Sequence, residues 1–262
     1  MARIIAVANQ KGGVGKTTTS VNLAASLAVM KRRVLLVDLD PQGNATMGCG
    51  IDKHTITVSS CDVLLGDAQY VDGILPVEEI GSLELLPANA DLTAAEVGLM
   101  HATLKEKRLA LALVPARDTY DYIIIDCPPS LNMLTLNALV AADGVLVPIQ
   151  TEYYALEGLT ALLSTIEQIQ ETLNPGLEIE GILRTMHDAR NNLANQVSAQ
   201  LITHFENRVF RTIIPRNVRV AEAPSHGLPV ILYDKASRGA ISYLALASEL
   251  TRKYEHREAV RA

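Results

Sequence analysis

One glycine-rich stretch near the start of the chain leaves few choices for the local fold around it. The stretch covers residues 10–18 and reads Gln-Lys-Gly-Gly-Val-Gly-Lys-Thr-Thr. It follows an apolar, strand-like run at residues 4–8 and precedes a helix-like run at residues 21–30. A strand, a glycine-rich turn and a helix in this order let successive backbone N–H groups surround a phosphate chain, with the positive end of the helix dipole behind them. The stretch therefore predicts a phosphate-binding loop.

The side chains of this loop fit a bound nucleotide. Its glycines permit the close approach and the positive φ angles that such turns adopt. Lys16 can reach the β- and γ-phosphates, and the Thr17 hydroxyl can ligate Mg²⁺. The usual pattern begins with a glycine, where this chain has Gln10, and Lys11 stands beside it as a second lysine. The loop is therefore a variant that carries two lysines.

Apolar runs and helix-like segments alternate along the rest of the chain. The runs at 34–37 and 122–125 are typical of strands buried on both faces of a parallel sheet. Further strands are expected at 83–86, 144–149, 179–183 and 209–214, and helices at 155–173, at 240–254 and within 92–113. No repeat or low-complexity linker interrupts this alternation. We therefore expect one α/β domain over residues 1–262, a doubly wound, mostly parallel sheet flanked by helices.

Acidic residues follow two of the predicted strands. Asp38 and Asp40 come after the run at 34–37, and Asp126 comes directly after the run at 122–125. Four apolar residues followed by Asp is the Walker B arrangement, in which a strand-end carboxylate holds Mg²⁺ through water. Ligands of doubly wound sheets bind outside the carboxyl ends of the strands, so these acids and the loop should meet in one crevice.

Charge and cysteine usage exclude several classes of protein. A formal net charge of −6 argues against a chain that coats nucleic acid over its whole surface, although it permits a local basic face. The three cysteines are widely spaced, which makes a disulfide framework or a zinc site unlikely and favours a reducing cytoplasm. No apolar run approaches the ~20 residues needed to span a bilayer. We expect a cytoplasmic protein.

Three stretches together resemble the ParA/MinD family of ATPases, whose phosphate loop is called the deviant Walker A motif. They are Lys11–Thr18, the run Asp38–Thr46 with its Asp-x-Asp-Pro start, and Ile214-Pro215-Arg216-Asn217. The resemblance covers essentially the whole chain. It implies a P-loop NTPase fold of the deviant Walker A type that hydrolyses ATP with Mg²⁺.

The resemblance also implies a role for individual residues. In the family the first lysine of the loop crosses a dimer interface to the partner's phosphates, so Lys11 would act there in the manner of an arginine finger. Asp40 would position the attacking water and Lys16 would contact the phosphates, while Asp38 has either a supporting or a loop-capping role. Thr17 would ligate Mg²⁺, and Asp126 would hold it through water. The residues implied in ATP binding are Lys11, Gly12, Gly13, Val14, Gly15, Lys16, Thr17, Thr18, Asp126, Pro215 and Asn217, with Pro215 packing on the adenine and Asn217 hydrogen-bonding its edge.

A basic segment points to a further ligand. Six arginines against two acidic residues fall between residues 181 and 220 of this acidic chain. This local excess of positive charge suits sequence-independent binding of the phosphate backbone of a nucleic acid. The simpler alternative is a basic surface that is only exposed to solvent. Arg190 and Arg219 match positions that resemble the family's non-specific DNA contacts, and Arg252 and Lys253 are weaker candidates.

Within the family the chain looks like the short, chromosomal ParA type. That type implies an ATP-dependent homodimer on non-specific double-stranded DNA, associated with the nucleoid and stimulated by a ParB-type centromere-binding partner. The first predicted strand starts at Arg3, without a preceding helix-turn-helix, and residues 252–262 are too polar for a membrane interface. Two alternatives remain, a MinD-like membrane-associated positioning ATPase and a metabolic ATPase that loads metal or clusters onto a target.

Overall fold

A computed structural model describes residues 1–152 and 155–261, and its strands form one sheet with the order β3-β4-β2-β5-β1-β6-β7-β8. Neighbouring strands run parallel except for β3, which pairs antiparallel with β4. The expected doubly wound, mostly parallel sheet is therefore confirmed. The strands are β1 (Arg3–Val7), β2 (Val34–Asp38), β3 (Leu75–Pro76), β4 (Leu83–Leu86), β5 (Tyr122–Asp126), β6 (Gly144–Gln150), β7 (Glu178–His187) and β8 (Val209–Pro215).

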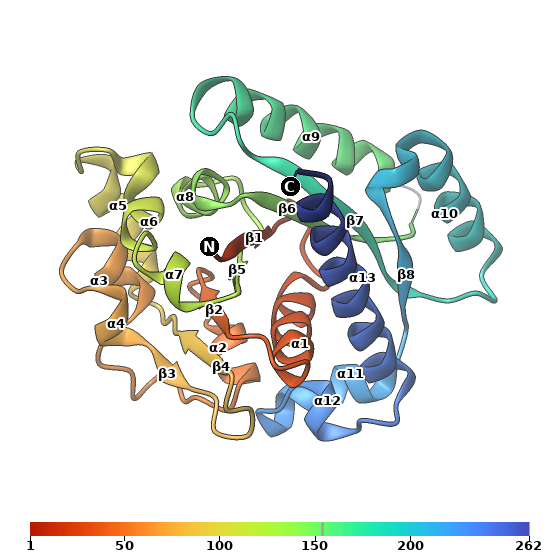
Figure 1. Cartoon of the computed structure of the whole chain (residues 1–262), viewed down its shortest axis with the longest axis horizontal. Coiled ribbons are helices and arrows are strands. Elements are labelled where there is room, and N and C mark those ends of the chain that lie inside the picture. Colours follow the sequence, from red (N-terminus) through yellow and green to blue (C-terminus); the bar gives the residue numbers. More distant parts are fainter. Residues whose placement is uncertain (153–154, 262) are drawn as a thin grey trace.

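Helices cover both faces of this sheet (Figure 1). One face packs on α3, α5, α6, α8, α9 and α10, and the other on α1, α12 and α13. The larger helices are α1 (Lys16–Val29), α5 (Leu92–Met100), α8 (Met133–Ala141), α9 (Ala155–Thr172), α10 (Asn192–Phe205) and α13 (Arg238–Arg261). The short ones are α2 (Asn44–Gly48), α3 (Ser60–Leu65), α4 (Tyr70–Gly73), α6 (Arg108–Ala112), α7 (Ala116–Thr119), α11 (Val218–Glu222) and α12 (Val230–Tyr233), with 3₁₀ turns η1 (Lys105–Lys107), η2 (Glu206–Arg208) and η3 (Ala223–His226).

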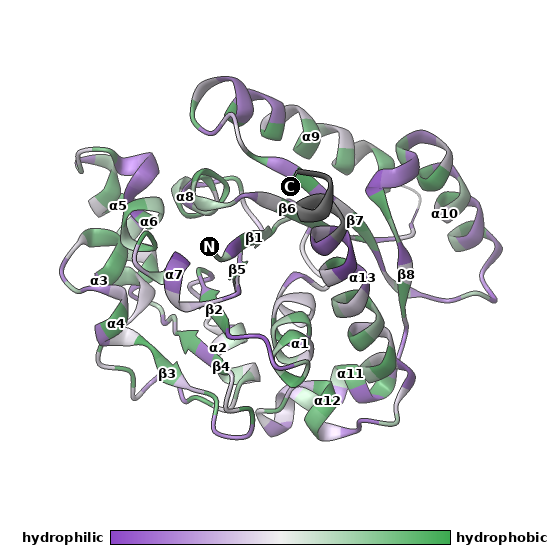
Figure 2. Ribbon diagram, viewed as in Figure 1, coloured by the Kyte–Doolittle hydropathy of each residue, from purple (hydrophilic) through white to green (hydrophobic). Residues whose placement is uncertain are grey.

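The alternation of side chains along each β-strand explains why the sheet has two hydrophobic cores, one on each face. Successive side chains point to opposite faces, so Ile4 and Ala6 enter one core while Ile5 and Val7 enter the other. Strands with helices on both sides must be apolar at every position, and β2 and β5 are buried along their whole length. The covering helices carry hydrophobic residues on one face and hydrophilic residues on the other, most visibly α9 and α10 (Figure 2).

Several elements differ from the expectation. Helix α1 begins at Lys16, five residues before the apolar run at 21–30, because its first turn carries the polar residues of the phosphate loop. Segment 92–113 contains two helices, α5 and α6, and Leu104, with a positive φ of 53°, precedes the 3₁₀ turn η1 that lies between them. Helices α8 and α10 and the short strand β3 were not predicted.

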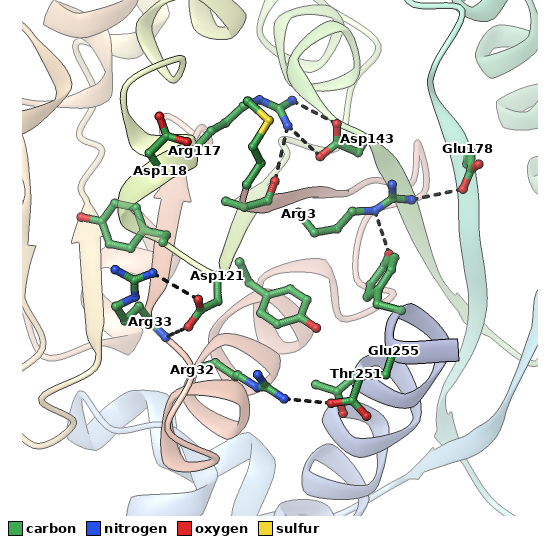
Figure 3. A pocket seen from close by; sticks show the side chains of 15 residues that line it. Arg3, Arg32, Arg33, Arg117, Asp118, Asp121, Asp143, Glu178, Thr251 and Glu255 are labelled. Carbon is green, nitrogen blue, oxygen red and sulfur yellow. Dashed lines mark hydrogen bonds and ion pairs between the residues drawn. The ribbon is translucent and has the colours of Figure 1, made fainter. Parts of the chain in front are cut away.

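A network of ion pairs lies at the amino ends of the central strands (Figure 3). Arg3 pairs with Glu178 at 3.2 Å, and Arg117 pairs with Asp143 at 3.0 Å. These residues line a hollow of about 510 Å³. These ion pairs connect the first strand to later segments of the chain. Because the cations that line the hollow are already paired with carboxylates, they offer little free charge for binding a phosphate chain. In the described part of the chain, no helix combines the length and the apolarity that crossing a bilayer requires.

Candidate nucleotide-binding site

The phosphate loop lies between β1 and α1, and its backbone has the conformation that its glycines predict. Gly13 and Gly15 have φ angles of 73° and 84°, a region that residues with a Cβ rarely adopt. A Cβ on Gly12 or Gly13 would meet no atom within 4 Å, so the loop borders open space. No side chain caps the start of α1, which leaves its first N–H groups free to bind an anion.

Three side chains hold this loop in place. Asn9 donates to the Pro148 carbonyl at 2.7 Å and accepts from the Lys11 backbone N–H at 2.9 Å. Thr185, at the carboxyl-terminal part of β7, donates its hydroxyl to the Val14 carbonyl at 2.8 Å. The Lys16 amine donates to the Lys11 carbonyl at 3.2 Å. The Val14 and Lys11 carbonyls are thus engaged within the chain, and the first N–H groups of α1 remain available to an anion.

Replacing Thr185 by Val should loosen the loop. The Val14 carbonyl would lose its buried donor, and an unsatisfied buried acceptor costs about 1–3 kcal/mol. We expect the dissociation constant for ATP to rise by roughly 5- to 100-fold, since 1.4 kcal/mol is a factor of ten. Thr185→Ser, which keeps the hydroxyl, is the matched control. Fluorescent-nucleotide titration of both variants checks this; equal weakening by Ser and Val would show that the hydroxyl is not what matters.

The two acids at the carboxyl end of β2, Asp38 within the strand and Asp40 after it, have different surroundings. Asp38 is fully buried, and its carboxylate accepts from the backbone N–H of Asp40 at 3.1 Å and from the N–H and hydroxyl of Thr46 at 2.9 and 2.8 Å. Asp40 instead borders the cavity described below, and among the described residues its carboxylate accepts only the Gln42 N–H, at 2.9 Å. Asp38 therefore braces the loop, and Asp40 is the acid of the two that lines the cavity.

Asp126 lies beside Asp38 in the sheet and is also fully buried. Its Oδ1 accepts the Ser20 hydroxyl at 2.7 Å, whereas Oδ2 has no hydrogen-bond partner among the described residues. Burial and the charge of Asp38 raise the pKa of Asp126, and burial likewise raises the pKa of Asp38. A buried oxygen that lacks a donor, close to the hydroxyl of Thr17, fits a divalent cation held directly or through water.

This pair of acids predicts a pH dependence of stability. Their folded pKa values lie above the unfolded ones, so the folded state binds more protons from about pH 4 up to the pKa of Asp126, about 8. The free energy of unfolding must therefore fall as pH rises through this window, by about 1.4 kcal/mol per pH unit for each excess proton. We expect a smaller fall between pH 5 and 8 in Asp126→Asn, measured by urea denaturation without nucleotide or Mg²⁺. Equal slopes in the two proteins would contradict it.

The loop, Asp40 and the end of β8 enclose one cavity of about 490 Å³, the size of a small-molecule site. Ile214 and Pro215 give it an apolar wall, and Asn217 lies beside them. The Asn217 Oδ1 accepts the Val220 N–H at 3.2 Å and so caps α11, which leaves the amide NH₂ group to donate to a ligand. Of the residues expected from the sequence, the cavity is lined by Gly12, Gly13, Gly15, Lys16, Thr17, Thr18, Asp40, Pro215 and Asn217.

Three expected nucleotide-binding residues do not line this cavity. Val14 and Asp126 are buried behind it. Lys11 is half-exposed outside it, and its amine pairs with Glu152 at 2.7 Å. The cavity also has walls that the sequence did not indicate, among them Met186 and Tyr243. Met186 has a φ of 47°, unusual for a residue with a side chain, and this local signal appears only in the backbone.

The two expected DNA-contact residues follow neighbouring strands. Arg190 comes after β7, is exposed, and forms a two-bonded pair with Asp188, which lowers the pKa of that carboxyl to about 2. Arg219 comes after β8, in α11, and pairs with Glu222 at 3.0 Å and with Asp234 at 3.4 Å. Both cations are thus on the surface but already neutralised within the chain.

The described residues do not support a metal cluster. No three His, Cys, Asp or Glu side chains among them are arranged to hold a metal ion. Cys49, Cys61 and Cys127 are buried, and burial raises the pKa of each thiol. In this environment the three thiols are held in the protonated form, as is usual for cysteines packed in a core.

Comparisons with known proteins agree with this geometry. Residues 2–179 match a family model described as an AAA domain. The sporulation initiation inhibitor protein Soj of Bacillus subtilis is 54% identical over 95% of this chain and 98% of its own length. The chromosome partitioning protein ParA of Myxococcus xanthus is 54% identical over 97% of this chain and 89% of its own.

A solved structure has the same architecture. It is described as cobyrinic acid a,c-diamide synthase of Mycobacterium smegmatis with a bound ATP analogue and magnesium, and it matches with a TM-score of 0.85 and 40% identity over 97% of this chain and 96% of its own. Identity at this level over nearly complete chains establishes membership, and the deviant Walker A loop lies in the matched region. The chain belongs to the ParA/Soj family of chromosome-partitioning ATPases.

Proposed function

We propose that this ATPase, a single domain over residues 1–262, forms a homodimer around two ATP molecules, binds DNA without sequence preference and releases it after hydrolysis. The observation that carries the proposal is the position of Lys11. The other charged residue of the loop, Lys16, lines the chain's own cavity, whereas Lys11 does not and its amine pairs with Glu152. Because Lys11 does not line the cavity of its own chain, its amine is available to contact ATP bound by another copy of the chain.

Lys11 is held only weakly where it is. Its pair with Glu152 joins two half-exposed side chains, and such pairs contribute about 0–1 kcal/mol. Contact with the γ-phosphate of an ATP bound to a partner would offer a charge-assisted hydrogen bond in a site from which water is excluded. We therefore expect ATP-dependent dimerisation to release Lys11 from Glu152.

The residues of the cavity divide the work of ATP hydrolysis. Phosphoryl transfer depends mainly on positioning and on electrostatic stabilisation. The Asp40 carboxylate, open to the cavity, would orient the attacking water, while Lys16 and the N–H groups of the loop hold the phosphates. Thr17 and Asp126 would hold Mg²⁺, which neutralises charge on the phosphates when bound. Pro215 would pack on the adenine, and the Asn217 amide would donate to its edge.

The ligand outside the ATP site is proposed to be DNA. Chromosome-partitioning relatives and the two exposed arginines that follow β7 and β8, Arg190 and Arg219, support this assignment; each would exchange its acidic partner within the chain for a phosphate. A ParB-type protein would accelerate hydrolysis and so release the DNA. The protein would then be cytoplasmic and associated with the nucleoid.

The test is DNA binding measured with ADP, with ATP and with a slowly hydrolysed ATP analogue. We expect high affinity only with ATP or the analogue, and weaker binding by Arg219→Glu, whose new carboxylate would join Glu222 and Asp234. Equal affinity in all nucleotide states would contradict the DNA part of the proposal. Flotation with anionic vesicles is the comparison for a membrane-bound positioning ATPase, and ATP-dependent flotation would favour that alternative.

A further inference from the structure

A second basic surface lies along the outer edge of the sheet. Strand β8 is the edge strand, and it runs between α10 and α13 (Figure 1). A hollow of about 1010 Å³ opens there around the first half of the strand. We call this region the β8-edge surface; its charged lining residues are Arg184, Arg208, Arg211, Arg252, Lys253, Glu180, Glu206 and Glu249.

Three cations of the β8-edge surface are unengaged. Arg208, Arg211 and Arg252 are exposed, and their guanidinium groups form no ion pair or hydrogen bond with the side chains and backbone groups that the structure describes. They come from three separate elements, η2, β8 and α13. Arg190 and Arg219 differ, because both are paired with acids of the chain.

The acids of this surface are mostly engaged. Glu180 is fully buried and pairs with Lys253 at 3.0 Å. Glu249 accepts the backbone N–H of Arg211 at 2.7 Å, together with the N–H and hydroxyl of Thr212 at 2.9 and 2.7 Å. Of the three acidic residues of the β8-edge surface, only Glu206 is exposed. The charge presented to solvent is therefore positive, although the chain as a whole is acidic.

A buried arginine fixes the shape of the strand. Arg184 is 4% exposed and donates to the Ser198 hydroxyl at 2.9 Å and to the Phe210 carbonyl at 2.7 Å. Its Nε, also buried, has no hydrogen-bond partner among the described residues. The register between β7 and β8 shifts at this point, and Arg184 fills the gap. Glu249 on one side and Arg184 on the other thus hold the backbone that carries Arg211.

The position of this surface keeps it open in the dimer proposed above. ATP binds at the carboxyl ends of the strands, and so the partner must approach from that end. Arg208 and Arg211 stand at the amino end of β8, with Arg252 near them on α13. Arg190 and Arg219 follow the carboxyl ends of β7 and β8, at the opposite end of the sheet.

We propose that the β8-edge surface is a second contact for the phosphate backbone of DNA, with Arg208, Arg211 and Arg252 each binding a phosphate. The inference rests on the proposed DNA binding and extends it down the edge of the sheet. Unpaired arginines suit this ligand because each can form two parallel hydrogen bonds to a phosphate and release a condensed counterion. Contacts of this kind position the protein and carry no sequence information.

The test combines Arg211→Ala with Arg252→Ala and measures DNA affinity with the ATP analogue at several salt concentrations. Each lost phosphate contact should reduce the slope of log K against log salt by about 1. We expect a slope lower by about 2 or more and an affinity at least 10-fold weaker at low salt. The matched control, Arg33→Ala with Lys107→Ala, removes two charges elsewhere and should leave the slope unchanged.

Two failures can be told apart. If the unaltered protein shows no ATP-dependent DNA binding, the proposed function itself fails. If it binds DNA but the Arg211/Arg252 variant keeps the same affinity and slope, only the β8-edge surface is ruled out. Analogue-dependent dimerisation and an unchanged melting temperature show that the variant is folded. A variant that loses binding to polyglutamate but retains DNA affinity would assign the surface to acidic proteins instead and overturn the inference.

Discussion

Asp40→Ala should lower the rate of ATP hydrolysis by about 10²–10⁴-fold, the usual contribution of a group that positions or deprotonates the nucleophile. Asp40 faces the cavity with most of its hydrogen-bonding capacity unused, so its removal takes away the acid that can orient water. The phosphate loop and the base-binding wall do not depend on it. ATP should still bind, and the ATP-bound dimer should accumulate because it no longer turns over.

Phosphate release and size-exclusion chromatography with ATP measure both effects. Asp38→Asn is the informative comparison, because Asp38 braces the loop through three hydrogen bonds and does not face the cavity. We expect that substitution to lower thermal stability, whereas Asp40→Ala should leave the melting temperature nearly unchanged. Normal hydrolysis by Asp40→Ala would show that another group orients the water.

Lys11→Ala should have an effect of similar size for a different reason. A cation delivered from a partner to the transferring phosphate contributes about 10³–10⁵ in kcat. Removing one member of a buried, hydrogen-bonded charge pair across an interface costs about 2–5 kcal/mol, and a symmetric dimer loses two such contacts. We expect both the ATP-dependent dimer and the hydrolysis to be lost.

Binding of ATP to the single chain should be nearly unchanged in this variant, because Lys11 does not line its own cavity. Lys16→Ala is the contrast, since Lys16 lies in the cavity and its loss should weaken ATP binding itself. Equilibrium nucleotide titration separates the two lysines. If Lys11→Ala and Lys16→Ala weaken ATP binding equally, both lysines act in the same site.

Much of the fold was predictable because its strands are strongly patterned. Continuous apolar runs such as β2 and β5 identify a parallel sheet without further information. Helix α8 was missed because it is apolar nearly all round and lies in the core, so it has no amphipathic period. Helix α10 was missed for a different reason: its first nine residues contain two Asn and two Gln, which are also typical of loops.

The candidate site was predictable where its residues are consecutive. The loop from Gly12 to Thr18 and the segment ending in Asn217 each carry their own pattern. Thr185 and Tyr243 reach the cavity only because the sheet brings distant segments together, and nothing in their local sequence indicates it. The division of roles between Asp38 and Asp40 likewise depends on the fold, because both residues are buried but only Asp40 of the two lines the cavity.

The central claim, that Lys11 acts on ATP held by a partner, is tested most directly by mixing two inactive variants. In a mixed dimer of Lys11→Ala and Asp40→Ala, the site of the Lys11→Ala chain keeps its own Asp40 and receives Lys11 from the other chain. We predict that hydrolysis by the mixture rises well above the sum of the two variants measured separately. A mixture no more active than that sum, under conditions in which mixed dimers are present, would contradict the account.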